Sequence, residues 1–248
     1  ELALNDGVCM LTGRTMGPRT GAPASFSSFD ELALAFENQV RHFVGHLVRY
    51  DNIIDTFHGD EAPLPLYSVA VKGCLEKGVD FNRGGAVYNA TGVQLMGFAN
   101  VADSLRALEK AVFTDRVCTL AELVGWLADD WMDAEDRRLY FLDKIPKYGN
   151  DDDDADAMAA RVMSHFCQTV SARKNFRGGS FWPGIFSVGF HLAFGSFTGA
   201  TPDGRSAGDI LGNGVTPANG RALNGPTAVF NSVTKLPLAE ATNGVNLN

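Results

Sequence analysis

The stretch SFDELALAFENQVRHFVGHL, residues 28–47, contains the strongest secondary-structure signal in the sequence. It opens with a capping box, in which the Ser28 side chain accepts a hydrogen bond from a free N–H of the first turn and Glu31 reaches back. Apolar side chains then recur at spacings of four and three residues, at Leu32, Phe36, Val40, Phe43 and Leu47. This periodicity predicts a long helix with one apolar face.

Three further helices are predicted on the same grounds. Apolar periodicity indicates a helix over residues 101–112 and another over residues 119–142, which we expect to be broken once. The latter begins with a second capping box, Thr119 to Glu122. A fourth helix is expected after the acidic run Asp151–Asp154. Of 27 glycines, only 2 fall in residues 98–177, which supports a helical middle block between flanks of loops and short strands.

Two short apolar stretches are predicted to form buried strands, at residues 64–71 and 227–233. Strands that alternate with long helices are typical of α/β proteins with a largely parallel sheet. The residues therefore predict an α/β fold class.

Composition excludes several classes of partner. The 248 residues carry a net charge of −8 and are 45% hydrophobic, as in a globular protein with a sizeable core. The acidic balance argues against duplex nucleic acid and anionic membranes, and no apolar run is long enough to span a bilayer. The first seven residues read as the last turn of a helix, so we expect the sequence to be part of a longer chain. The spacing of the cysteines fits neither a disulfide framework nor a zinc site, and they are Cys9, Cys74, Cys118 and Cys167. Because the first residues also show no signal sequence, we expect a reducing cytoplasm.

Three patterns imitate ligand sites without their full set of residues. His42 and His46 have the spacing of zinc ligands, but no third ligand lies in register, so a pair on the flank of a helix is the better interpretation. A calcium loop starting at Asp152 would lack its required Gly and Glu, and the acidic run 151–154 is expected to complement a helix dipole. Gly212-Asn213-Gly214 lacks the remainder of a dinucleotide-binding loop. No metal ligand is predicted.

Nine short motifs follow one another along essentially the whole chain. They are LALNDG (2–7), SFDE (28–31), APLP (62–65), CLEKG (74–78), GGAVYN (84–89), ANVADSL (99–105), PKYGND (146–151), GATPDGR (199–205) and GPTA (225–228). In this order they resemble the glycyl radical enzymes, the superfamily of pyruvate formate-lyase and glycerol dehydratase. The tail at residues 225–233 is similar to the diol dehydratase and choline lyase branch.

The resemblance implies a ten-stranded α/β barrel, of which residues 1–248 would be a partial, internal portion. In the family, a radical-SAM activase abstracts hydrogen from a C-terminal Gly. The resulting radical oxidises a Cys on a loop inside the barrel, and the Cys then takes hydrogen from the substrate. The motif order implies that this Cys precedes residue 1 and that the Gly follows Asn248. We therefore expect no catalytic residue and no bound cofactor in this chain, and no activity from it alone.

Cys74 imitates the catalytic loop, because it lies in Gly73-Cys74-Leu75-Glu76. The resemblance instead places it in a helix before a strand at Gly84–Ala86, so it is not predicted to be the reactive thiol. Cys9 matches no Cys motif of the family.

The resemblance places three residues on the wall of the substrate cavity, after a bend at Pro183-Gly184. They are Ile185, Phe186 and Ser187. Glycerol dehydratase has Tyr at the position of Phe186, and the missing hydroxyl argues against glycerol as substrate. Packing of Phe186 against the barrel wall is the alternative interpretation.

Three functions follow from the resemblance. The first is a lyase or dehydratase that cleaves a C–O, C–N or C–S bond in a small polar substrate. The second is a formate C-acetyltransferase or decarboxylase acting on C–C bonds, which adjacent cysteines in the missing loop would indicate. The third is a barrel scaffold without chemistry of its own when isolated. The expected partners are the substrate, the activase and a second copy of the chain, in the cytoplasm.

Overall fold

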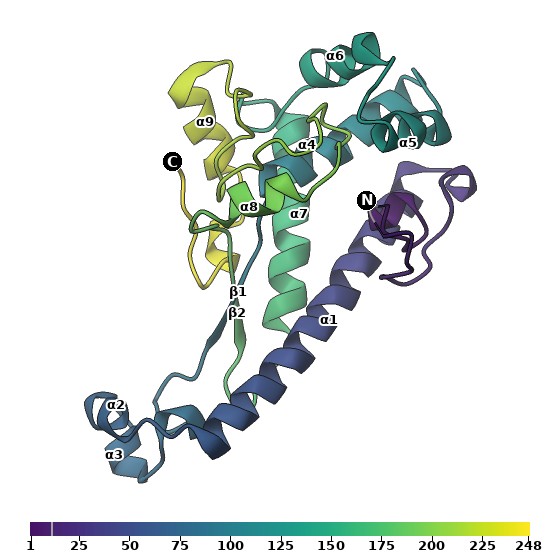
Figure 1. Ribbon diagram of the computed structural model, residues 1–248. Coiled ribbons are helices and arrows are strands. Elements are labelled where there is room, and N and C mark those ends of the chain that lie inside the picture. Colours follow the sequence, from purple (N-terminus) through teal and green to yellow (C-terminus); the bar gives the residue numbers. More distant parts are fainter. Residues whose placement is uncertain (11) are drawn as a thin grey trace.

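Helices account for most of the regular structure in the computed structural model, which describes residues 1–10 and 12–248 (Figure 1). The helices are α1 (Phe29–Glu61), α2 (Pro65–Ala70), α3 (Cys74–Lys77), α4 (Phe98–Leu108), α5 (Leu120–Ala128), α6 (Glu135–Asp143), α7 (Asp153–Ser171), α8 (Phe190–Ser196) and α9 (Gly225–Thr234). The strands in the described residues are β1 (Thr91–Gln94) and β2 (Phe181–Gly184). The described chain is thus a helix-rich α/β structure.

Helix α1 confirms the helix expected from residue 28. The Ser28 hydroxyl accepts a hydrogen bond from the Glu31 N–H at 3.3 Å, whereas the Glu31 carboxylate reaches one residue further back, to the Ser27 N–H. The first part of the apolar stripe is buried, with Leu32 only 1% exposed. Phe43 and Leu47 remain 39% and 43% exposed. Helix α1 runs away from the helical cluster toward α2 and α3 (Figure 1).

The core lies where α4 packs on α7 and α7 packs on β2. Phe98, Met163 and Phe181 are fully buried there. The helix expected at 101–112 starts earlier, at Phe98, and continues beyond Leu108 as a π-helical turn, Glu109–Thr114. Burial of one face of both helices accounts for this packing.

The predicted break in the third helix is confirmed. Helices α5 and α6 are separated by residues 129–134, and Asp130, Trp131 and Asp133 adopt left-handed backbone angles there. The capping box at Thr119 is also confirmed, since its hydroxyl accepts from the Glu122 N–H and the Glu122 carboxylate accepts from the Thr119 N–H. Local capping therefore places the start of α5.

The strands are parallel, as expected for an α/β fold. Thr91 to Gln94 pair in register with Phe181 to Gly184, and α4 to α7 form the connection between them. The opposite edge of β2 is also occupied, because the Asn243 N–H donates to the Pro183 carbonyl at 2.8 Å and Ile185 forms a parallel bridge with Val245. Three chain segments thus run side by side in one direction.

The strand predictions for residues 64–71 and 227–233 are wrong, because these residues form α2 and α9. Each helix has a proline in its first turn, where the ring presets a helical φ and the missing N–H is not needed. In α2 the apolar side chains are exposed, with Leu66 at 86%. Without a neighbouring strand to complete its backbone hydrogen bonds, an apolar run of this length does not adopt the extended conformation of a strand.

Two smaller expectations are also corrected. Gly84–Ala86 is not a strand, since Gly84 ends a 3-10 helix at a φ of 87° and the strand of this region is β1. At the start of the chain, Leu2–Leu4 forms a short 3-10 helix instead of an α-helical turn.

Candidate functional site

The residues predicted to line the substrate cavity follow directly after β2. Its last carbonyl, on Gly184, accepts from the Leu95 N–H at 2.9 Å, so the carboxyl ends of β1 and β2 meet at one edge. On the other side, Ile185 donates its N–H to the Gly244 carbonyl at 3.0 Å and accepts from the Asn246 N–H at 3.2 Å. Binding groups of barrels with parallel strands lie at this end of the strands.

The bend predicted at Pro183 and Gly184 is wrong. Both residues belong to β2, and their carbonyls accept hydrogen bonds from Asn243 and Leu95 on opposite sides. Sheet partners on both edges hold this segment extended, which overrides the turn preference of a Pro-Gly pair.

Phe186 lies back over the end of the strand. A Cβ at Gly184 would be 2.7 Å from Cε1 of Phe186 and 3.2 Å from Cβ of Asn243. The Phe186 ring therefore occupies the space that only a glycine leaves open. Its side chain is half-buried, whereas Ile185 is fully buried in the apolar core.

Ser187 is fully buried, and its hydroxyl lies between two side chains from other segments. Its Oγ is 2.7 Å from Nδ1 of His191, on α8, and 2.6 Å from Oδ1 of Asn213. Sequence reasoning missed both partners. Asn213 stands 26 residues away and belongs to a Gly-Asn-Gly stretch that offers no local signal for this contact.

An apolar cavity of about 230 Å³ lies between the start of the chain, α1, α4 and the loop around Thr201. Met96, Asn100 and Leu211 are among its lining residues, while Ile185, Phe186 and Ser187 are not. The assignment of these three residues to a substrate cavity therefore stays a prediction.

Three of the sequence motifs converge on one buried polar cluster. Asn100, on α4, donates from Nδ2 to the Asp203 carboxylate at 2.7 Å and accepts at Oδ1 from the Gly212 N–H at 2.7 Å. Arg205 donates four hydrogen bonds to main-chain carbonyls of residues 198–209. The motifs ANVADSL and GATPDGR are therefore joined by the side-chain hydrogen bond between Asn100 and Asp203, while Arg205 braces the loop around its own motif.

The third motif, PKYGND, joins the cluster through Asp103 and Lys147. Asp103 is 1% exposed, and its Oδ1 accepts from the Tyr148 N–H at 2.8 Å. Burial raises the pKa of Asp103 and lowers the pKa of Lys147, since a low-dielectric interior disfavours both charges. An aspartate on the inward face of α4, among Ala99, Ala102 and Leu105, is the sequence signal that could have revealed this cluster.

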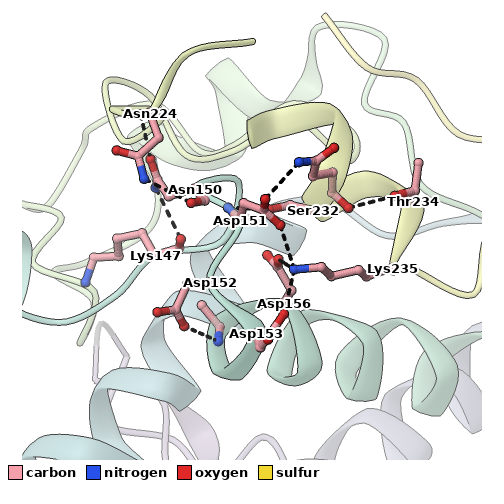
Figure 2. A network of polar contacts seen from close by, with 12 residues as sticks. Lys147, Asn150, Asp151, Asp152, Asp153, Asp156, Asn224, Ser232, Thr234 and Lys235 are labelled. Carbon is pink, nitrogen blue, oxygen red and sulfur yellow. Dashed lines mark hydrogen bonds and ion pairs between the residues drawn. The ribbon is translucent and has the colours of Figure 1, made fainter. Parts of the chain in front are cut away.

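The acidic run is structural, as expected, and does more than cap α7 (Figure 2). Asp152 caps the helix by accepting from the Ala155 N–H at 2.9 Å. Lys235, at the end of α9, lies between Asp151, Asp153 and Asp156, with Nζ–Oδ distances of 2.8, 2.8 and 3.0 Å. Hydrogen bonds to these carboxylates raise the pKa of Lys235 and join α9 to the start of α7.

The remaining candidates form no site among the described residues. The His42 and His46 rings are 4.5 Å apart on α1, and no group of three potential ligands lies together in residues 1–10 and 12–248. Cys74 is buried at the first position of α3, in a helix as predicted. Within the described part of the chain, no helix is both long and apolar enough to cross a bilayer.

Comparison with known proteins shows which family shares this architecture. The pyruvate formate lyase-like family model matches residues 1–195. (2S)-3-Sulfopropanediol dehydratase of Klebsiella oxytoca is 35% identical over all of this chain and 31% of its own length. Trans-4-hydroxy-L-proline dehydratase of Clostridioides difficile is 33% identical over the same shares.

Solved structures agree. The glycerol-bound, B12-independent glycerol dehydratase of Clostridium butyricum is 40% identical and superimposes with a TM-score of 0.97, over 100% of this chain and 31% of that chain. The chain thus spans about a third of the length of the relatives that it matches. With its motifs, its parallel strands and its matched residues in agreement, the chain belongs to the pyruvate formate lyase-like family.

Proposed function

We propose that the chain is one portion of a glycyl radical dehydratase that cleaves a C–O bond in a small hydroxylated substrate, within the wider class of lyases for C–O, C–N and C–S bonds. The similarity of the whole chain to the sulfopropanediol, hydroxyproline and glycerol dehydratases carries this proposal. A TM-score of 0.97 with the glycerol dehydratase supports the same local framework for the substrate.

The three parallel segments support a place in a ten-stranded barrel that further strands would close. β1, β2 and residues 243–246 would be adjacent strands of the barrel, and residues 1–248 would form a partial barrel domain. The reactive Cys and the radical Gly are proposed to lie outside this portion. A radical-SAM activase, a homodimer and a cytoplasmic location belong to the same proposal.

The radical, when installed, supplies hydrogen-atom abstraction from a substrate carbon. The residues of this chain would determine the shape of one wall of the substrate cavity. Phe186 offers an apolar ring without a hydrogen-bonding group, and the Ser187 hydroxyl is already engaged by His191 and Asn213. Polar recognition of the substrate would therefore come from other parts of the barrel, while this wall limits substrate size and excludes water.

The test uses the full-length protein, activated without oxygen by its cognate radical-SAM enzyme. Glycyl radical content is measured by electron paramagnetic resonance. Glycerol, 1,2-propanediol, 3-sulfopropanediol and trans-4-hydroxyproline are then supplied in turn, and loss of water from each is followed by mass spectrometry. Dehydration of at least one supports the proposal. A full radical signal with no dehydration, but with pyruvate cleavage dependent on coenzyme A or with arylacetate decarboxylation, would replace it with C–C chemistry.

A further inference from the structure

The hydroxyl of Ser187 has two polar neighbours and a single proton to give. Its Oγ is 2.6 Å from the Asn213 Oδ1 and 2.7 Å from the His191 Nδ1. Asn213 Oδ1 also accepts a longer hydrogen bond from the Asn246 side-chain amide, at 3.4 Å. An amide oxygen only accepts, so Ser187 donates its proton to Asn213.

This assignment determines the state of the histidine ring. Because the only proton of Ser187 is directed at Asn213, the contact with His191 requires a proton on Nδ1 of the ring. Neutral His191 is therefore the Nδ1–H tautomer, and its Nε2 carries the lone pair. The order of donation runs from His191 to Ser187 and on to Asn213.

The hydrogen bonds from His191 to Ser187 and from Ser187 to Asn213 form a relay, and the turn next to it is strained. Val188, directly after Ser187, has a φ of 45°, which a β-branched residue rarely adopts, and Gly189 follows at 86°. The Phe190 N–H donates to the Ser187 carbonyl at 2.8 Å and closes the turn into α8. Strain of this kind persists only where surrounding contacts over-determine the conformation. The hydrogen bonds of Ser187 are such contacts.

The far end of the relay is anchored to the core. The residue before Asn213, Gly212, donates its N–H to Asn100 Oδ1 at 2.7 Å, and Asn100 is 4% exposed on α4. The Leu211 N–H donates to the His191 carbonyl at 3.4 Å. The relay thus connects the residue next to Phe186 to a buried, fixed helix.

We propose that His191 is a positioning residue, which acts through Nδ1–H on Ser187 to hold Phe186 in place and so sets which substrate fits against this wall. The proposal deepens the function proposed above and rests on it for its catalytic readout. The structural part of the proposal, namely the tautomer of His191 and the direction of hydrogen-bond donation, does not depend on the substrate.

Two substitutions of His191 test the roles of its two ring nitrogens separately. The amide nitrogen of Asn reaches the position of Nδ1, whereas the amide of Gln reaches that of Nε2. His191→Asn keeps the donor to Ser187 and removes Nε2, and His191→Gln does the reverse. His46→Gln, on the exposed part of α1, is the matched control for loss of a histidine.

The activated full-length protein is assayed with the two diols glycerol and 1,2-propanediol. We expect His191→Gln to lower kcat/KM about ten-fold or more and to change the ratio between the diols, because a buried hydroxyl loses its donor. His191→Asn should stay within about three-fold of the wild type, since the donor remains. Radical content should be equal in all variants. Equal losses in both variants, no loss in either, or a loss confined to His191→Asn would overturn the proposal.

A second measurement does not depend on turnover. The full-length protein is labelled with ¹⁵N at histidine, and the His191 signals are assigned by difference from His191→Asn. We expect a protonated Nδ1 and an unprotonated Nε2 in the neutral ring. The opposite tautomer overturns the proposal even if every variant folds poorly. If the wild type dehydrates neither diol, the variants are compared with whichever of 3-sulfopropanediol and trans-4-hydroxyproline it dehydrates. If it dehydrates none of the four substrates, the proposed function fails, while the tautomer still decides the role of His191 toward Ser187.

Discussion

Asn100 donates a hydrogen bond to Asp203 over 2.7 Å, although 103 residues separate them in the sequence. The same Asn100 side chain accepts from the Gly212 N–H. One amide on α4 thereby contacts both the tight turn at Thr201–Arg205 and the segment that leads to Asn213. Asn100 is thus one of the contacts that position this loop beside residues 185–187.

Replacement of Asn100 by Ala should destabilise the full-length protein. The change leaves the buried Asp203 carboxylate and the Gly212 N–H each without one partner, at about 1–3 kcal/mol per group. The midpoint of urea denaturation measures the effect. Asn219→Ala, on the exposed surface nearby, is the control and should change the midpoint little. Equal midpoints for both variants would show that the cluster contributes nothing to stability.

Replacement of Lys235 by Met should lower thermal stability most clearly near neutral pH. The hydrogen bond from Lys235 holds the pKa of Asp151 below its ordinary value of 3.8. A lowered carboxyl pKa stabilises the fold above the ordinary pKa, and this contribution disappears as pH falls through the folded-state value. The pKa of Lys235 is raised, so its own contribution is complete at neutral pH and is lost only in strong base.

The difference in melting temperature between wild type and Lys235→Met should accordingly shrink when the pH is taken from 7 toward 3. Lys144→Met, at an exposed position, provides the comparison. A difference that is constant across this range contradicts the role given to Asp151.

Replacement of Phe186 by Tyr should change substrate preference without changing radical content. A hydroxyl left unpaired beside the native substrate would cost about 1–3 kcal/mol, which corresponds to roughly ten- to a hundred-fold in kcat/KM. The measurement compares the native substrate with a hydroxylated analogue, alongside electron paramagnetic resonance of the radical. If neither substrate is affected, Phe186 serves only to pack against the neighbouring residues.

Residues 1–248 produced alone should expose apolar surface. Phe43, Leu47, Tyr50, Ile54 and Phe57 recur at helical spacing along α1 and are 39% to 63% exposed. Contiguous apolar surface of this kind favours association, and unclosed sheet edges add to it. We expect aggregation or strong binding of an apolar dye. A monodisperse monomer that melts cooperatively would show that the portion folds independently.

The sequence by itself determined the features that depend on neighbours in the chain. The caps at Ser28 and Thr119, the acidic start of α7 and the break between α5 and α6 were predictable, because a helix start is stabilised by side chains within one turn of it. The order of nine motifs was enough to identify the family, which the match over residues 1–195 confirmed. The position of Ile185, Phe186 and Ser187 on the substrate wall came from that resemblance and is still a prediction.

The tertiary structure alone decided what depends on contacts between distant segments. Residues 64–71 and 227–233 have apolar runs that fit a strand or a helix equally well, and the absence of neighbouring strands in the described residues leaves them helical as α2 and α9. Pro183 and Gly184 form a strand for the opposite reason, since segments lie on both sides to accept and donate their hydrogen bonds. The contact of Ser187 with Asn213 and both contacts of Asn100 are equally nonlocal. A hydrogen bond constrains geometry only between groups that folding has already brought within about 3 Å, and no local pattern encodes that distance.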